Sequence, residues 1–156
     1  MTTQQIIFKV GNGEYGMDVS QVNAIESLNN VVAVPNAANH ILGIINLRGE
    51  VLPVYSLRTK FGMEEEPVGA ATKIIVTRSN GVAIAFKVDE VKEIAELNDA
   101  QLSPFPDMAR SAETAYADRV AHLENRLILL INQNALLHEE ESAAISEFVS
   151  KAAENR

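Results

Sequence analysis

The chain has 156 residues, and its 13 Lys and Arg against 21 Asp and Glu give a formal net charge of -8. Nucleic-acid binding rests on clustered basic residues, and the basic residues here are scattered among more numerous acidic ones, so we expect no nucleic-acid partner. The chain has no cysteine, so it has no disulfides and no thiolate metal sites. Its apolar runs are at most five residues long, whereas a membrane helix needs about twenty. We therefore expect a cytoplasmic protein with no direct membrane insertion.

The opening segment has the period-two pattern of a half-buried β-hairpin. Apolar residues alternate on both sides of a turn signal at Gly11–Gly13, namely Ile6, Phe8, Val10, Tyr15, Met17 and Val19. Val19, Val22 and Ile25 then recur at three-residue spacing. That spacing predicts one or two helical turns packed on the sheet.

A second hairpin is predicted in the middle of the first half. Residues 41–47 are almost continuously apolar, and Gly49-Glu50 is the expected turn into a strand at 51–54. Pro53 lies inside that strand, so we expect it at an edge or a bulge.

A short helix and a polar link are predicted next. Ser56 can cap a helix over Leu57–Phe61, which Gly62 ends. The acidic stretch Met63–Pro67 is interpreted as a solvated link between the two halves of the chain.

The second half of the chain repeats the first. Val88, Val91 and Ile94 repeat the spacing of Val19, Val22 and Ile25 at an offset of 69 residues. Asn125-Arg126 and the strand Leu127–Ile131 resemble the turn Gly49-Glu50 and the strand at 51–54. Residues 102–107 carry two prolines and are predicted as a loop. These patterns predict two similar all-β units with short helical inserts, one centred on residues 6–67 and the other on 73–131.

The tail is predicted to be an amphipathic helix over residues 141–154. Ile145, Phe148, Val149 and Ala152 fall at i, i+3, i+4 and i+7. Such a helix either packs back on its own domain or docks on a partner, and packing on its own domain is the more common outcome.

The sequence carries no recognisable catalytic constellation, metal-binding motif or cofactor motif. His40, His122 and His138 are far apart, no serine lies in a Gly-x-Ser-x-Gly elbow, and the runs of glutamate lie in polar stretches. An enzyme or small-ligand binder would have to gather His40, Arg48 and Tyr55 at one barrel mouth. We therefore expect no catalytic residue, no metal and no cofactor.

Arg48 is the unusual residue of the segment Pro35–Leu57, because it belongs to an otherwise mostly apolar strand between Gly43 and Gly49. A buried arginine without a partner is very costly, so Arg48 must reach a carboxylate or water. The segment is therefore either an ordinary hairpin with one outward arginine or a docking face on which Arg48 anchors another protein.

The same segment resembles the signature of CheW domains. The resemblance rests on Pro35, Gly43-Ile-Ile-Asn-Leu-Arg-Gly49, Val-Leu-Pro-Val and Leu57, supported by Glu14–Val19, Val88–Val91 and Arg126–Ile131. It places a CheW-like domain at residues 5–140. It implies a mainly β fold of two SH3-like five-stranded barrels.

The resemblance also implies a function. Proteins of this family are non-catalytic adaptors that couple the cytoplasmic tips of methyl-accepting chemoreceptors to the regulatory domain of a CheA-type histidine kinase, in the two-component signal transduction of chemotaxis. The positions that match the family's interaction face are Val22, Gly43 and Arg48, and we add their neighbours Asn46, Leu47 and Gly49. Ala24 and Ser56 stand where the family often has Glu and Asp, which leaves open an adaptor of a non-flagellar kinase array.

Overall fold

The computed structural model of the chain describes residues 2–28, 30–37, 40–79, 82–109, 111, 114–132 and 135–136. The protein is mainly β with two sheets, as the sequence predicted. The amphipathic helix predicted over 141–154 lies outside the described residues. Within the described residues, no helix is long and apolar enough to cross a membrane.

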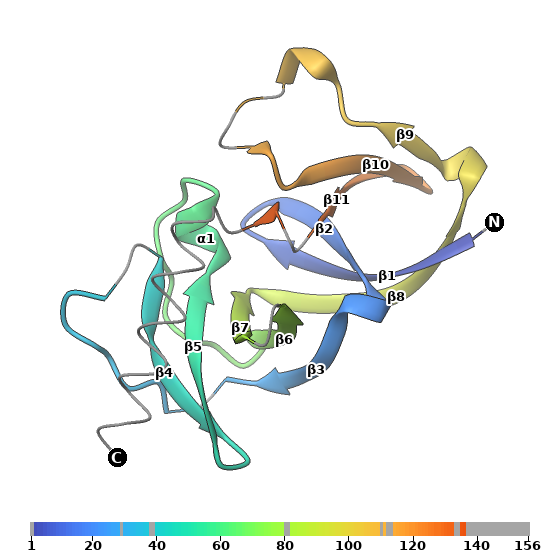
Figure 1. Ribbon diagram of the computed structural model, residues 1–156. Coiled ribbons are helices and arrows are strands. Elements are labelled where there is room, and N and C mark those ends of the chain that lie inside the picture. The colour runs from blue at the N-terminus through green and yellow to red at the C-terminus, as the bar shows by residue number, and fades with distance from the viewer. Residues whose placement is uncertain are drawn as a thin grey trace.

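The larger sheet has six strands in the order β8-β1-β2-β11-β10-β9 (Figure 1). Its strands are β1 (Thr2–Val10), β2 (Gly13–Asp18), β8 (Glu90–Asn98), β9 (Leu102–Pro104), β10 (Ala117–Leu123) and β11 (Arg126–Ile131). The sixth strand is the short β9, which pairs with β10 in a stretch that the sequence predicted as loop. Its three residues, the last of them Pro104, end the sheet at this edge.

The smaller sheet has five strands in the order β3-β6-β7-β5-β4. These are β3 (Val22–Ser27), β4 (Ile41–Leu47), β5 (Glu50–Ser56), β6 (Lys73–Ser79) and β7 (Val82–Val88). Helix α1 (Leu57–Lys60) follows β5, and the Ser56 hydroxyl caps it by accepting a hydrogen bond from the Thr59 amide at 3.2 Å. This helix and its cap agree with the prediction.

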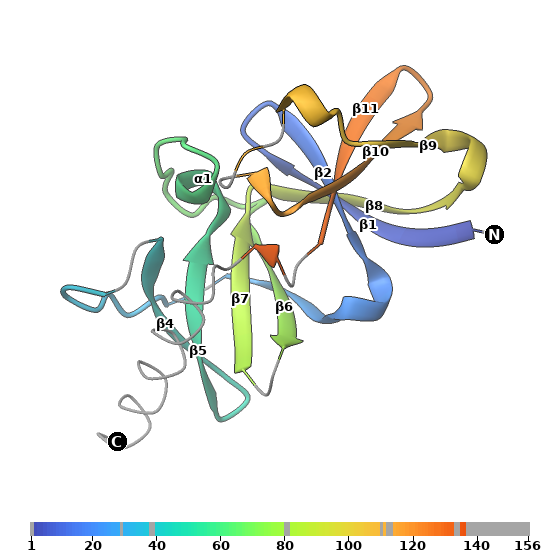
Figure 2. The ribbon, with the colours of Figure 1, turned by 45° about the horizontal axis from the view of Figure 1, so that its top comes forward.

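Each sheet takes strands from both halves of the chain, so residues 6–67 and 73–131 do not each form one sheet. The opening hairpin β1–β2 joins the sheet of the second half through a parallel pairing with β11, and β6–β7 joins the first-half strands through β5. The chain crosses between the sheets at the 3-10 turn Val19–Gln21 and again at Asp89 (Figure 2). Periodicity predicted strands such as β1, β2, β4 and β7, but it missed β3, β8, β9 and β10, and it carries no information about which strands pair.

The duplication extends to the register of the strands. Gln5 faces Asp18 on the β1–β2 pair, and Ile74 faces Lys87, 69 residues later, on the β6–β7 pair. The β4–β5 and β10–β11 hairpins correspond at an offset of 76, and both carry a register shift at the matching place, after Ile41 and after Ala117. The two sheets are therefore built on one plan.

Three hydrophobic clusters follow from this plan. The central cluster lies between the sheets and combines β1 and β2 residues such as Phe8 with β5 and β7 residues such as Tyr55 and Phe86. Each sheet also has its own cluster on its other face, one around Leu52 and Ile74 and the other around Ile7, Leu97 and Ile128. Ile6 and Phe8 belong to the central cluster, and Ile7 belongs to the cluster on the other face of the six-stranded sheet. The predicted alternation along β1 is thus confirmed.

The three-residue spacing of Val19, Val22 and Ile25 gives less helix than predicted. One 3-10 turn, Val19–Gln21, is followed directly by edge strand β3, and Ile25 is exposed. Its counterpart Ile94 lies on edge strand β8 and is also exposed.

The acidic link after α1 is only partly solvated. Glu65 forms an ion pair with Lys87 of β7, whose side chain is 7% exposed, and accepts a hydrogen bond from the Ser56 hydroxyl. Lys87 also donates to the Glu66 carbonyl at 2.6 Å. The buried ammonium anchors the link, so the prediction of a fully solvated stretch is wrong.

Candidate protein-interaction surface

Arg48 and Gly49 form the two-residue turn between β4 and β5. Both have positive φ, 52° and 88°, and Leu47 faces Glu50 across the base of the turn. Positive φ at both central positions is typical of the tight hairpin turn that matches strand twist. The turn therefore lies one residue earlier than the Gly49-Glu50 turn predicted from the sequence, and Arg48 projects from the turn, outside the strand.

The Arg48 guanidinium meets a carboxylate, which is one of the two partners, carboxylate or water, that the sequence allowed. It forms an ion pair with Glu26 of β3, while 72% of the Arg48 side chain stays exposed. Strands β3 and β4 are the two ends of the five-stranded sheet. The pair therefore joins one edge of the sheet to the other.

Backbone pairing closes the same sheet. Val32, which follows β3 along the chain, pairs with Ile44 of β4 through two hydrogen bonds of 2.9 Å. Because Val32 continues from one edge strand and pairs with the other, the five strands curl into a closed, barrel-like layer. The Arg48 turn lies at one end of this layer.

The neighbours of Arg48 hold the turn in place. The Asn46 side chain accepts a hydrogen bond from the Gly49 amide at 2.9 Å. Leu47 is half-buried against the cluster around Leu52 and Ile74. On the other arm, Glu50 pairs with Arg78 of β6 at 2.8 Å. The exposed arginine thus stands on a locally well-tied hairpin.

Gly43 is buried and lies away from this turn. A Cβ at Gly43 would lie 2.2 Å from the carbonyl oxygen of Val32, so no side chain fits where the Val32 segment crosses β4. The structure gives Gly43 a role in closing the sheet.

Val22 also lies apart from the turn. It is half-buried at the start of β3 against the central cluster, four residues before Glu26, which is about 13 Å along a strand. The turn thus brings together Asn46, Leu47, Arg48 and Gly49, but neither Gly43 nor Val22.

No motif or spacing in the sequence marks Glu26, Glu50 or Arg78 as part of this surface. The available signal was the expectation that Arg48 reaches a carboxylate or water, but 22 residues separate Arg48 from Glu26 in the chain. Only the closure of the sheet selects Glu26 among the acidic residues.

The alternative ligand site at His40, Arg48 and Tyr55 does not assemble. His40 precedes β4 and Arg48 follows it, so the seven residues of the strand separate them. His40 lies near Tyr55, with ring centroids 5.6 Å apart, but Tyr55 is fully buried. Within the described residues, no group of three or more His, Asp or Glu side chains is arranged to hold a metal ion.

Comparison with known proteins gives a consistent result. The family model of the CheW-like domain matches residues 4–141. The chain is 31% identical to the chemotaxis protein CheW of Klebsiella aerogenes, over 90% of this chain and 84% of that protein. It is 30% identical to chemotaxis protein CheW of Bacillus subtilis, over 89% of each chain.

A solved structure has the same fold. The scaffolding protein TtCheW from Thermoanaerobacter tengcongensis superposes with a TM-score of 0.76 at 26% identity, covering 85% of this chain and 90% of that one. The mainly β, two-sheet architecture is therefore shared with a protein that is named as a scaffold.

Proposed function

Since the chain belongs to the CheW-like domain family, we propose that it is a non-catalytic adaptor in chemotaxis signal transduction, coupling chemoreceptors to a CheA-type histidine kinase. The observation that carries the proposal is the match over residues 4–141, together with relatives named as chemotaxis proteins and a structural relative named as a scaffolding protein. The partners are the regulatory domain of the kinase and the cytoplasmic tip of a methyl-accepting receptor.

The Arg48-Gly49 turn, with its β4 neighbours Asn46 and Leu47, is the proposed contact with one of these partners. Arginine is enriched at interface hot spots because its planar donor fork sits on an apolar stem. Here Glu26 and the Asn46–Gly49 hydrogen bond hold the exposed arginine before any partner arrives. A side chain that is already ordered loses less conformational entropy on binding.

Reversal of the Arg48 charge tests the proposal. We expect Arg48→Glu to weaken binding to the kinase regulatory domain or to a receptor-tip fragment at least about tenfold, measured by titration calorimetry with purified proteins. Arg48 is exposed, so the variant should keep a single cooperative unfolding transition.

Lys92→Glu supplies the matched control, since Lys92 is exposed on β8 of the other sheet. Equal loss of binding in both variants would show a general effect of net charge. Unchanged binding of Arg48→Glu to both partners would overturn the assignment of this surface. Failure of the folded wild-type chain to bind either partner would overturn the adaptor role.

A further inference from the structure

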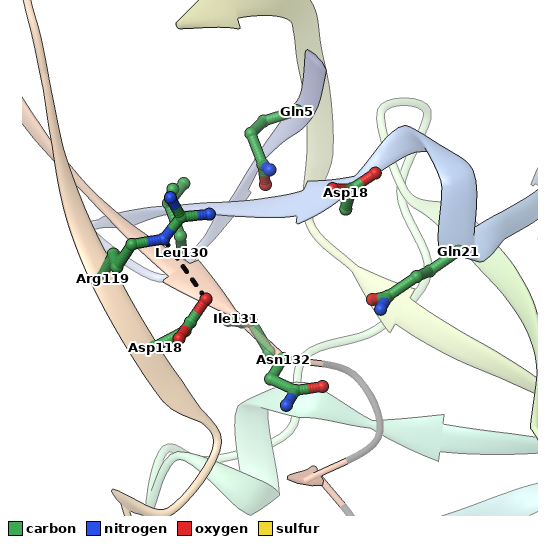
Figure 3. Close-up of a pocket in the computed structure, with 8 residues that line it drawn as sticks. All are labelled: Gln5, Asp18, Gln21, Asp118, Arg119, Leu130, Ile131 and Asn132. Carbon is green, nitrogen blue, oxygen red and sulfur yellow. Dashed lines mark ion pairs between the residues drawn. The ribbon is translucent and has the colours of Figure 1, made fainter. Parts of the chain in front are cut away.

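A polar pocket of about 210 Å³ opens at one end of the six-stranded sheet (Figure 3). It lies between β1, β2, β10 and β11 and is lined by Gln5, Asp18, Gln21, Asp118, Arg119, Leu130, Ile131 and Asn132. The pocket is far along the chain from the Arg48 turn, and it belongs to the other sheet. None of the residues of the proposed adaptor contact lines it.

Gln5 is the deepest polar group of this pocket. Its side chain is 2% exposed, and none of the described residues donates a hydrogen bond to its buried Oε1. In Figure 3 the amide end of Gln5 points toward the middle of the lining residues. A buried carbonyl without a donor is costly, so a donor that reaches this oxygen is favoured.

The hydrogen bonds assign the two ends of the Gln5 amide, because Nε2 donates to Thr3 and Oε1 has no donor among the described residues. Thr3 donates its hydroxyl proton to Asp18 at 3.4 Å, so it can only accept from Gln5, whose Nε2 donates to it at 3.1 Å. The chain of donors ends on the Asp18 carboxylate. Because each donation polarises the next group, the Gln5 carbonyl becomes a stronger acceptor.

Asp18 adds a negative charge at the same place. Burial by itself would raise the pKa of Asp18, but hydrogen bonds from Ser20 and Thr3 and the nearby Arg119 lower it below the ordinary value. The carboxylate is therefore ionised at neutral pH.

The corresponding end of the five-stranded sheet shows how such a pocket is filled. Lys87 is the counterpart of Asp18 at the offset of 69, and Ser56 is the counterpart of Asn132 at the offset of 76. There, Lys87 and Ser56 together bind the carboxylate of Glu65, which the link inserts between them. The chain thus fills one of two equivalent positions with an acidic side chain.

The six-stranded sheet carries the opposite polarity at these positions. Asp18 replaces the buried ammonium of Lys87, Asn132 replaces the Ser56 hydroxyl, and Gln5 places a carbonyl where Ile74 has none. We propose that this pocket receives the ammonium group of a lysine side chain from a partner protein, between Gln5 Oε1 and the Asp18 carboxylate. The pocket of about 210 Å³ has room for an ammonium and its methylene stem.

Arg119 sets the strength of the site. It lies at the rim, 40% exposed, and is paired with Asp118 at 3.4 Å. Two carboxylates against one guanidinium leave the lining with an excess of one negative charge. A bound ammonium is therefore attracted overall, but less than it would be without Arg119.

The test titrates the full chain with n-butylammonium and with a lysine residue blocked at both ends, followed by the NMR signals of the Gln5 side-chain amide and of the Asp18 and Asn132 backbone. Both probes carry the lysine stem and ammonium, so we expect similar dissociation constants, on the order of millimolar. Acetate serves as the control of opposite charge, and it should leave these signals in place.

Three variants locate the site without dismantling the fold. Gln5→Leu removes the acceptor, and Asp18→Asn removes the charge while keeping an oxygen for the cap on Ser20. Each should weaken both probes about fivefold or more. Arg119→Gln should strengthen both about threefold, since it removes a like charge.

Unchanged binding in Gln5→Leu or Asp18→Asn, with the fold intact by thermal unfolding, would overturn the proposal. So would signals that respond equally to acetate. Spermidine is the probe for a free polyamine as the natural ligand, and spermidine binding a hundredfold tighter than the blocked lysine would overturn the assignment to a protein side chain. None of these outcomes depends on whether the chain binds a kinase or a receptor.

Discussion

Asp89 shows at the scale of single residues how the crossing between the sheets is held. Its carboxylate accepts hydrogen bonds from Arg58 at 2.9 and 2.7 Å and from the Gly11 amide at 2.7 Å. Burial would raise the pKa of Asp89, but these bonds outweigh burial and lower the pKa below its ordinary value of 3.8. Asp89 lies at the β7–β8 crossing, and its two partners, Arg58 and Gly11, come from α1 and the β1–β2 turn.

The first prediction concerns this carboxylate and pH. A group with a lowered folded-state pKa contributes stability above its unfolded pKa, and the contribution is lost as pH falls through the folded value. We expect Asp89→Asn to reduce the free energy of unfolding at pH 7 by about 2 kcal/mol and to flatten the loss of stability below pH 4. Urea unfolding between pH 2.5 and 7 measures both effects.

Glu90→Gln is the control for Asp89→Asn, because Glu90 is adjacent and exposed. It should leave the unfolding free energy within about 0.5 kcal/mol of the wild type. If the unfolding free energy of Asp89→Asn fell as much at low pH as that of the wild type, the role given to this carboxylate would be contradicted.

The second prediction compares two glycines of the proposed interaction segment. Gly43→Ala places a Cβ against the Val32 carbonyl, so it should destabilise the fold by about 2–3 kcal/mol. Gly49→Ala meets no atom within 4 Å and is strained only by its φ of 88°, at a cost of about 1 kcal/mol. Thermal unfolding of the two variants measures the difference, and an equal loss in both would show that the Val32 crossing does not constrain Gly43.

At the scale of elements, the link Met63–Pro67 between the two halves is attached to β7 through the ion pair of Glu65 with Lys87. The ammonium of Lys87 is buried in β7, and Glu65 supplies its counter-charge. A buried pair contributes little compared with an apolar pair of the same size, but removing one member leaves an uncompensated charge. The link therefore depends on Glu65 more than on its other acidic residues.

The third prediction is a double-mutant test of this pair. Glu65→Gln should destabilise the fold by about 3 kcal/mol, because Lys87 then stays buried without a counter-charge. Adding Lys87→Met should recover most of that loss, since Met is apolar and of similar length. Chemical unfolding of the two single variants and the double variant gives the coupling, and additive losses would contradict a direct pair.

At the scale of the whole molecule, the exchange of hairpins makes the two sheets one folding unit. The hairpin β1–β2 has its neighbours β8 and β11 in the second half of the chain, and the central cluster needs both sheets. An isolated half would leave this cluster exposed and its strand edges unpaired. Cooperative unfolding follows from this arrangement.

The fourth prediction follows from that exchange. Residues 1–70 and 71–156, expressed separately, should each lack the dispersed NMR spectrum of a folded domain. Mixing them should restore the spectrum, because each fragment holds the missing strands of the other's sheet. Independent folding of either fragment would contradict the interleaved topology.

The sequence by itself determined the types of most elements and the faces they bury. Alternation in residues 6–19 placed Phe8 and Ile7 on opposite faces, and Ser56 marked the start of α1. The turn after β4 was predicted one residue too late, with Arg48 inside the strand. These features depend on neighbours within a few residues, where periodicity and capping act.

Only the tertiary structure decided which strands pair and which distant residues meet. Strand exchange, the choice of Glu26 as partner of Arg48, the burial of Gly43 under Val32 and the pocket at Gln5 and Asp18 all join residues far apart in the chain. Periodicity indicates that a face is buried, but it does not indicate which residues cover that face. The sequence likewise offers 21 acidic residues as partners for an arginine and does not distinguish among them. Closure of the sheets removes that freedom, because it brings one particular carboxylate within reach.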